Sequence, residues 1–319
     1  MNKNDKNMKK IAFTIALVLS LGLSNVWAEE NGVNNTNSGV RTIKSPRFAR
    51  PLVEKWIEEY AKTEPGVVFQ IVKGSGNQDN IDLNIVSDNQ ENSSQSFSHI
   101  VYFGETAVLP ITARSSEAAR LLEGKHLNAK KLKQLFFLND DFEEEVKKNK
   151  VFETIIIYSG SNASSVASSF AHNFSEESAN FRGKRISGDD LFLNTALQKD
   201  PLGVSFNALS NIFDLKSRHL KSDLSLVGLD LRKALENSFS DNGTLDDVLN
   251  ILENGKPAEI TVEKVGIKFN NADDAVNHFL QWVLENGTKY NHEYGLLNLD
   301  KKETNAQINK VQSVLTALK

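Results

Sequence analysis

The stretch from Thr154 to Phe174 restricts the possible folds more than any other part of the sequence. Residues 155–157 are all isoleucine, residues 158–162 have the sequence Tyr-Ser-Gly-Ser-Asn, and a serine-rich segment with helical spacing then continues to Phe174. This order predicts a buried strand that turns through small residues directly into a helix. The first N–H groups of such a helix lack partners and lie at the positive end of its dipole, so the turn favours an anion. An ordinary cap on a helix of small residues explains this segment alone equally well.

Two further segments have the same character. Gly74-Ser75-Gly76 follows a predicted strand at 67–72, and Ser45-Pro46-Arg47-Phe48 directly precedes a predicted helix at about 49–63. In parallel α/β sheets, ligands bind beyond the carboxyl ends of the strands, where such turns lie. One Gly-Ser-Gly turn is a weak indication, because turns favour these residues in any case. Three such turns together predict a site for an oxyanion.

Strands and helices alternate along the rest of the chain, which predicts an α/β fold with largely parallel sheets. Pro110 cannot donate a hydrogen bond to a neighbouring strand, so its segment is expected to be an edge or a crossover strand. The remaining predicted strands are 81–86, 101–103, 107–112, 203–206, 224–229 and 260–269, and the remaining predicted helices are 116–122, 129–137, 189–198, 274–285 and 303–318.

The N-terminus has the pattern of an export signal. Four lysines within residues 3–10 precede an uncharged, mostly apolar run at 11–23, and Ala28 supplies a small residue at the expected cleavage point. The run is too short to span a bilayer and no Cys follows it, so we expect cleavage of residues 1–28 rather than a membrane or lipid anchor. Residues 29–40 are rich in Asn, Gly and Ser and are expected to form a flexible leader.

Composition narrows the possible partners. The chain contains no Cys, so a hydrophobic core must hold the fold without disulfides. About 290 residues remain after cleavage, more than one core usually organises, and two lobes are therefore expected. Residues 1–28 carry four Lys and one Asp, a net charge of +3, so the remaining chain has a net charge of −7 where the whole chain has −4. Because an acidic chain disfavours nucleic acid and anionic membrane surfaces, we expect neither as a partner.

Patterns for catalysis, metal binding and nucleotide binding are weaker. The Ser161 turn lacks the Gly two residues on either side that a nucleophile elbow needs. The six His residues show no metal-ligand spacing, and neither Gly-rich turn is followed by the Lys-Ser or Lys-Thr of a P-loop. An exported serine hydrolase would need a base that the sequence does not display. We therefore predict no enzyme, no metal and no cofactor.

Over nearly all of its mature length, the chain resembles the phosphate-type periplasmic substrate-binding proteins of ABC importers. No single motif is specific, but together they are. The matching segments are 48–56 with the family's Phe-Pro-x-Pro…Lys-Trp opening, 69–76 with its first Ser-Gly loop, 81–88 with the following strand and Ser-Asp turn, 159–161 with its second Ser-Gly loop, 202–206 with its Gly-Ile-Gly-Tyr strand, and 260–269 with 279–283 and Gly287 for its return strand and closing helix.

The resemblance implies a two-lobed α/β fold, the type II periplasmic-binding-protein fold, with a hinge and a ligand cleft between the lobes. Residues 41–112 plus 266–319 would form the first lobe and residues 113–265 the second. It also implies a periplasmic monomer that captures inorganic phosphate or a related oxyanion and passes it to an ABC transporter permease. The alternative is a degenerate binding-protein scaffold that serves as a protein-interaction or sensory module.

The resemblance also implies the site residues. Phe48 and Ser75 would face the oxyanion from the first lobe, and Asp88 would accept the proton of a monoprotonated phosphate. Ser161 and Asn162 stand, with Ala163, at the family's Ser-Gly-Thr positions in the second lobe. Of these three residues, Ser161 alone keeps the family's side chain.

One departure from the family pattern concerns charge. The family's cleft arginine, four residues before that serine, is Ile157 in this chain. A charge-assisted hydrogen bond is worth about 1.5–3 kcal/mol, so its loss would weaken anion binding by about tenfold or more. Arg47 is a candidate replacement, because it lies beside Phe48 at a position that contacts the anion in the family. The alternative interpretation of Arg47 is a surface residue before a helix.

Overall fold

The computed structural model describes residues 39–72, 81–87, 98–138, 149–160, 165–270 and 273–317. Its strands are β1 (Arg41–Lys44), β2 (Phe69–Ile71), β3 (Leu83–Ser87), β4 (His99–Ala113), β5 (Ile156–Gly160), β6 (Lys184–Ile186), β7 (Gly203–Ala208), β8 (Leu224–Leu226) and β9 (Thr261–Phe269). Its α-helices are α2 (Arg50–Thr63), α3 (Glu117–Leu122), α4 (Ala129–Phe136), α5 (Lys150–Thr154), α6 (Ser165–Asn173), α7 (Leu191–Lys199), α8 (Leu209–Ile212), α9 (Lys233–Glu236), α10 (Leu245–Asn254), α11 (Asp274–Trp282) and α12 (Lys301–Ala317). Short turns of other helix types are η1 (Ser178–Asn180), η2 (Val283–Gly287), η3 (Thr288–Tyr290) and η4 (His292–Tyr294).

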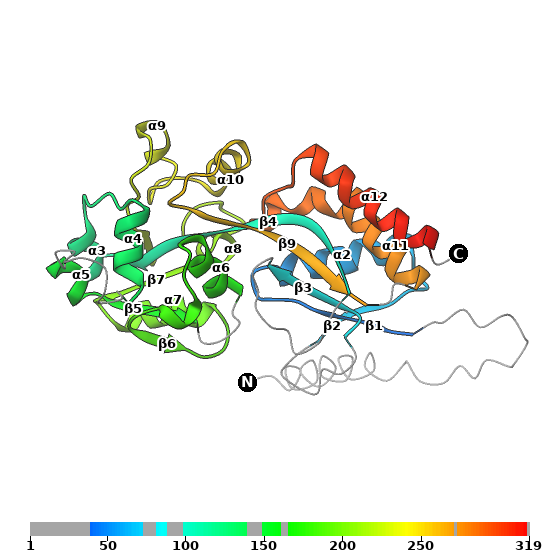
Figure 1. Cartoon of the computed structure of the whole chain (residues 1–319), viewed down its shortest axis with the longest axis horizontal. Helices are drawn as coiled ribbons and strands as arrows, with labels where there is room; N and C mark the ends of the chain where they lie inside the picture. Colours follow the sequence, from blue (N-terminus) through cyan, green and yellow to red (C-terminus); the bar gives the residue numbers. More distant parts are fainter. Residues whose placement is uncertain are drawn as a thin grey trace, which may run out of the picture. The chain divides into compact units, whose positions relative to one another are not determined.

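These strands form one mixed sheet in the order β2-β1-β3-β9-β4-β7-β5-β6, with β8 paired to β4. The two outer parts of the sheet are parallel: β1 runs parallel to β2 and β3, and β5 runs parallel to β6 and β7. The middle is antiparallel, because β9 runs opposite to both β3 and β4, and β4 runs opposite to β7. Figure 1 shows β4 and β9 side by side through the middle of the sheet. The predicted parallel arrangement therefore holds only for the two outer parts.

The longest strand, β4, joins two segments that the sequence analysis treats as separate strands. It pairs with β9 as far as Val108, and then with β8 from Ile111 onward, while β7 lies along its other side. Pro110 lies where the partner of β4 changes from β9 to β8. The N–H that proline lacks is not needed there for pairing between strands. Its carbonyl oxygen accepts from the N–H of Val227 at 3.0 Å. The segment is thus a crossover strand, and the edge-strand option is wrong.

The helix after the first turn forms as its sequence predicts. Leu52, Val53, Trp56 and Tyr60 recur at helical spacing and are all buried, and Pro51 occupies the first turn, where its missing N–H costs nothing. The helices α3, α4, α7, α11 and α12 and the strands β2, β3, β5, β7 and β9 likewise confirm predicted elements. The sequence analysis does not predict β1, β6 or α10. In the described part of the chain, no helix combines the length and apolar character needed to cross a membrane.

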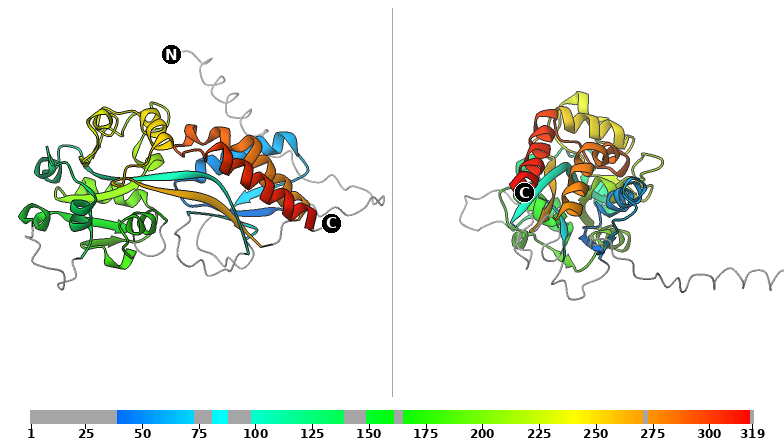
Figure 2. Two further views of the ribbon diagram at one scale, coloured as in Figure 1. Left: turned by 45° about the horizontal axis from the view of Figure 1, so that its top comes forward. Right: turned by 90° about the vertical axis from the view of Figure 1, so that its right-hand side faces the viewer.

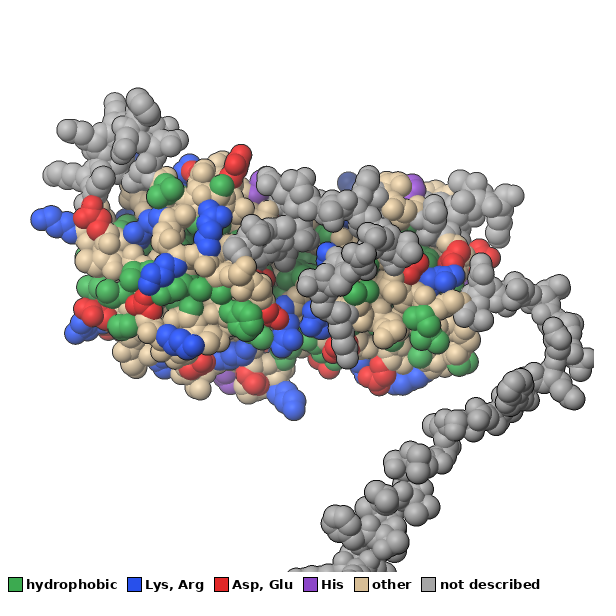
Figure 3. Space-filling view, turned by 90° about the horizontal axis from the view of Figure 1, so that it is seen from below, with side chains coloured by type: hydrophobic (Ala, Val, Ile, Leu, Met, Phe, Trp, Pro, Cys, Tyr) green, Lys and Arg blue, Asp and Glu red, His purple; other side chains and the backbone are tan. Residues whose placement is uncertain are grey.

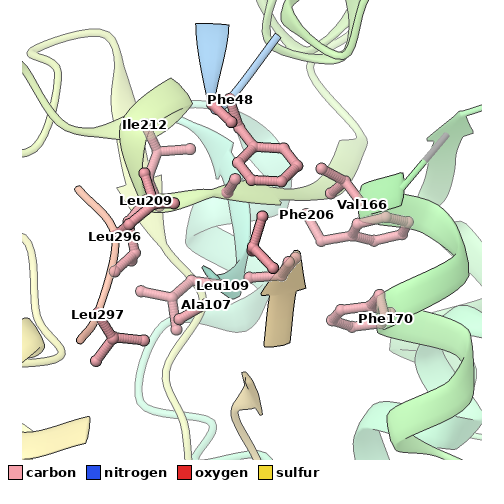
Figure 4. Packing of buried hydrophobic residues seen from close by; sticks show 14 of the residues in the cluster. Phe48, Ala107, Leu109, Val166, Phe170, Phe206, Leu209, Ile212, Leu296 and Leu297 are labelled. Atoms are coloured by element: carbon pink, nitrogen blue, oxygen red, sulfur yellow. The ribbon is translucent and has the colours of Figure 1, made fainter. Parts of the chain in front are cut away.

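The helices cover both faces of the sheet and bury an aromatic core. The two views of Figure 2 place α11 and α12 together beside β4 and β9, and α12 packs against β4 and α11. Trp56 of α2 meets Phe103 of β4 edge-on, with ring centroids 4.7 Å apart. Phe170 of α6 and Phe206 of β7 stack with centroids 4.2 Å apart (Figure 4). The core therefore holds α2 and α6, whose starts border the predicted anion site.

Candidate functional site

Four of the six predicted site residues, Ser75, Asp88, Ser161 and Asn162, lie outside the described residues. Two of the strands that lead to them end close to where the sequence predicts. Strand β3 ends at Ser87, directly before Asp88, and β5 ends at Gly160, directly before Ser161. The helix after the second turn, α6, begins at residue 165. Arg47 and Phe48 are described, and they lie in the turn before α2.

Phe48 anchors this turn in the core. Its side chain is 1% exposed, and Figure 4 shows its ring pointing toward Val166 in the first turn of α6. Its carbonyl oxygen accepts a hydrogen bond from the Ser210 hydroxyl at 3.1 Å. Nothing in the described part of the chain accepts from the N–H of Phe48. Phe48 could therefore offer an anion this N–H group, while its ring holds the starts of α2 and α6 near one another.

Arg47 points to a different neighbour. Its side chain is 43% exposed, and its Nε lies 3.8 Å from Oδ2 of Asp189, just before α7. The other carboxylate oxygen of Asp189 accepts from the N–H of Leu191 at 3.0 Å. A carboxylate beside Arg47 would compete with an anion for the guanidinium, since both are acceptors of the same donors.

Residue 157, where the family has its cleft arginine, is part of the hydrophobic core in this chain. Ile157 is fully buried in β5. Two residues further on, the Ser159 hydroxyl is also buried, and it has no hydrogen-bond partner among the described residues. An arginine at 157 would have to bury its charge among apolar side chains, which is costly unless the charge is paired. Positive charge for an anion must therefore come from elsewhere than β5.

A polar cluster joins the end of β3 to α6 and β9. The hydroxyls of Ser87 and Ser169 lie 3.3 Å apart, and Ser169 also donates to Oε2 of Glu263. All three side chains are buried. His172, largely exposed on α6, has its Nδ1 3.9 Å from Oε1 of Glu263. The residue before Asp88 and the helix after Ser161 thus meet around a buried carboxylate.

The sequence analysis does not single out Glu263 or Ser169. A signal for Glu263 exists, because strand residues alternate between two faces and Glu263 shares its face with the buried Thr261 and Val265. A charged residue on the buried face of a strand indicates a special environment. Ser169 carries no comparable signal, since serines occur throughout α6.

Replacing Ser169 with Ala is expected to lower the free energy of unfolding by about 1.5–3 kcal/mol, because the buried Glu263 carboxylate loses a charge-assisted hydrogen bond. In a Glu263→Gln background, the same replacement should cost about 1 kcal/mol or less, because the acceptor is then neutral. Urea unfolding of the wild type, the two single variants and the double variant measures both costs. If Ser169→Ala lowered the free energy of unfolding equally in both backgrounds, the stabilisation by Ser169 would not come from its hydrogen bond to the Glu263 carboxylate.

The two larger described cavities lie away from these residues. One, of about 800 Å³, lies between α3 and the segments 225–231 and 236–241. The other, of about 590 Å³, lies between α9, α10 and residues 255–259. Within the described ranges, no group of three or more His, Cys, Asp or Glu side chains is arranged to hold a metal ion. On the face seen in Figure 3, basic and acidic side chains are interspersed, so attraction of an anion would depend on local groups.

The chain matches no protein-family model and no curated protein sequence. Among solved structures, it is similar to a candidate phosphate ABC transporter substrate-binding protein with bound phosphate from Clostridium perfringens, with a TM-score of 0.55 and 13% sequence identity, covering 82% of this chain and 100% of that chain. It is also similar to an ABC-type phosphate transport receptor from Vibrio cholerae, with a TM-score of 0.54 and 13% identity, covering 82% of this chain and 100% of that chain. The chain therefore has the mixed α/β fold of the periplasmic substrate-binding proteins, as the sequence predicts.

Proposed function

We propose that the chain is an exported substrate-binding protein that captures phosphate or a related oxyanion for an ABC importer. The observation that carries this proposal is that α6 meets both the turn before α2, through Val166 and Phe48, and the end of β3, through Ser169 and Ser87. Each borders a turn in which the sequence places hydroxyls or free N–H groups. Two structures of similar fold are described as phosphate-binding or phosphate-transport proteins, which supports the choice of anion.

In the proposed mechanism, two lobes close around a desolvated anion, and no covalent bond forms. The N–H groups at the starts of α2 and α6 and the hydroxyls of Ser75 and Ser161 donate to the anion. Asp88 accepts the proton of a monoprotonated phosphate, and Asn162 supplies a further polar group. Residues 1–28 would direct the chain to the periplasm and be removed there.

The degenerate scaffold remains a second candidate, because three observations favour it. Ile157 is buried where the family has its arginine. Asp189 lies beside Arg47. The Glu263 carboxylate already accepts from the Ser169 hydroxyl in α6. In this interpretation, the protein's own carboxylates would accept the hydrogen bonds that a receptor donates to its ligand. The chain would then bind a protein partner instead of an anion.

Titration calorimetry of residues 29–319 distinguishes the two functions. The protein is freed of bound anion by partial unfolding and dialysis, and is then titrated with phosphate and with sulfate. We expect micromolar or tighter binding of phosphate, weakened about tenfold or more by Ser75→Ala and by Ser161→Ala. The control is Ser313→Ala, which removes an exposed hydroxyl on α12 and should leave the affinity unchanged.

The absence of both heat and thermal stabilisation at millimolar phosphate or sulfate would contradict the receptor function. A bound ligand must raise the apparent stability of the folded chain, so a folded protein that shows neither effect does not bind these anions. That result would favour the scaffold, and the search would turn to protein partners.

A further inference from the structure

Lys221, which precedes β8, carries a half-buried charge that forms no ion pair with any other described residue. Its ammonium donates to the backbone carbonyl oxygen of Asn211, with Nζ 2.7 Å from that oxygen. Among the described residues, no carboxylate oxygen lies within the 4.0 Å of an ion pair with this ammonium. A buried charge is costly unless it is paired, so a cation in this position favours a nearby anion.

Asp214, one of the two carboxylates whose charge acts on this ammonium, is hydrogen-bonded to backbone N–H groups. Oδ1 of Asp214 accepts from the N–H groups of Ser217 at 2.7 Å and Lys216 at 3.1 Å, and these bonds lower the pKa of Asp214. Desolvation lowers the pKa of Lys221, although the charges of Asp223 and Asp214 raise it. Both charges thus act on the ammonium, but neither Asp214 nor Asp223 has a carboxylate oxygen within the 4.0 Å of an ion pair with it.

Lys221 and Arg47 approach the same helix. Ser210 and Asn211 are neighbours in α8, and Ser210 donates to the carbonyl of Phe48 at 3.1 Å while Asn211 accepts from Lys221. Through these two contacts, α8 holds the turn that carries Arg47 on one side and Lys221 on the other. Desolvation is the main cause that lowers the pKa of Lys221, and the positive charge of Arg47 adds to it.

We propose that Lys221 and Arg47 form a cation pair that binds the charged oxygens of the anion. This inference rests on the proposed receptor function. The pair supplies the positive charge that the chain lacks at Ile157, from the segment before β8 and the turn before α2 rather than from β5. An anion between the two cations removes their mutual repulsion and gives Arg47 an alternative to its long contact with Asp189.

The test is phosphate titration of the anion-free wild type, Lys221→Met and Lys216→Met. The first variant keeps the apolar stem of Lys221 and removes its charge, and the second removes an exposed charge five residues away as the matched control. Lys221→Met should weaken phosphate binding about tenfold or more, and Lys216→Met less than about twofold. Raising the ionic strength should reduce the difference in phosphate affinity between the wild type and Lys221→Met, because salt screens the charge of Lys221.

A second measurement covers the case in which Lys221→Met does not fold. In wild-type protein with ¹³C-labelled lysine, phosphate should shift the Cε signal of Lys221, assigned with Lys221→Arg, and leave that of Lys216 in place. A wild type that binds phosphate with the Lys221 signal unmoved, or with equal affinity in a folded Lys221→Met, would overturn the cation pair alone. A folded wild type that binds neither phosphate nor sulfate would overturn the pair and the receptor function together.

Discussion

Replacing Phe206 with Ala is expected to lower the free energy of unfolding by about 3–5 kcal/mol. The ring is fully buried in β7. It stacks on Phe170 of α6 with an interplanar angle of 4°, and the ring of Phe181 lies 5.0 Å away between centroids. The replacement removes an aromatic side chain from a packed interior, and the neighbouring rings can close only part of the cavity.

Urea unfolding measures this loss, with Phe192→Ala as the matched control. Phe192 has the same side chain but is 52% exposed, so its replacement should change the free energy of unfolding by no more than about 0.5 kcal/mol. A loss of less than about 1 kcal/mol for Phe206→Ala would mean that the ring does not occupy the core as described. Because Phe170 and Val166 share α6, we also expect Phe206→Ala to loosen the start of that helix (Figure 4).

Replacing Gly183 with Ala is expected to lower the free energy of unfolding by about 2–5 kcal/mol. Gly183 has a φ of +88°, which side chains with a Cβ rarely adopt. A Cβ there would lie 2.2 Å from the carbonyl oxygen of Ile157 and 2.9 Å from its backbone nitrogen. Because both atoms belong to the backbone of β5, no side-chain rotation can relieve the overlap.

The control is Gly66→Ala, since no atom lies within 4 Å of a Cβ at that position. It should change stability by less than about 1 kcal/mol in either direction. Thermal and urea unfolding compare the two variants, and equal stabilities would contradict the close approach of residue 183 to β5. If Gly183→Ala folds, the proposed receptor function also predicts that a displaced β5 weakens phosphate binding, because β5 leads into the turn at Ser161.

Local sequence patterns predict the longer elements and miss those that depend on distant partners. The buried positions and Pro51 place α2 to within one residue of its observed start. By contrast, β1 has four residues, and it is a strand because residues 69–71 and 83–84 pair with it. The omission of α10 is a different case, since Thr244 caps it and Leu245, Val248, Leu249 and Leu252 are buried at helical spacing. Those signals are present in the sequence.

The candidate site divides in the same way. Turns rich in Ser and Gly can be recognised from the sequence, because the reason for those residues is local. Glu263 and Ser169 meet across 94 residues of chain, and Lys221 donates to the carbonyl of Asn211 in α8, so these contacts arise from tertiary packing. The resemblance that identifies Ile157 as a missing arginine points to Arg47 as a candidate replacement, but it gives no indication of Lys221.

The position of β9 determines when the molecule can fold. Strand β9 begins at Thr261, yet it lies between β3 and β4, which are finished by residue 113. During synthesis, β3 can pair with β1 early, but most of the chain must be made before its second neighbour, β9, exists. Pairing across such long separations is slow, because the entropy of closing the loop is lost before the contacts form. If the chain is exported as proposed, this delay is useful, since a chain that has not yet closed its sheet can still be threaded through a narrow channel.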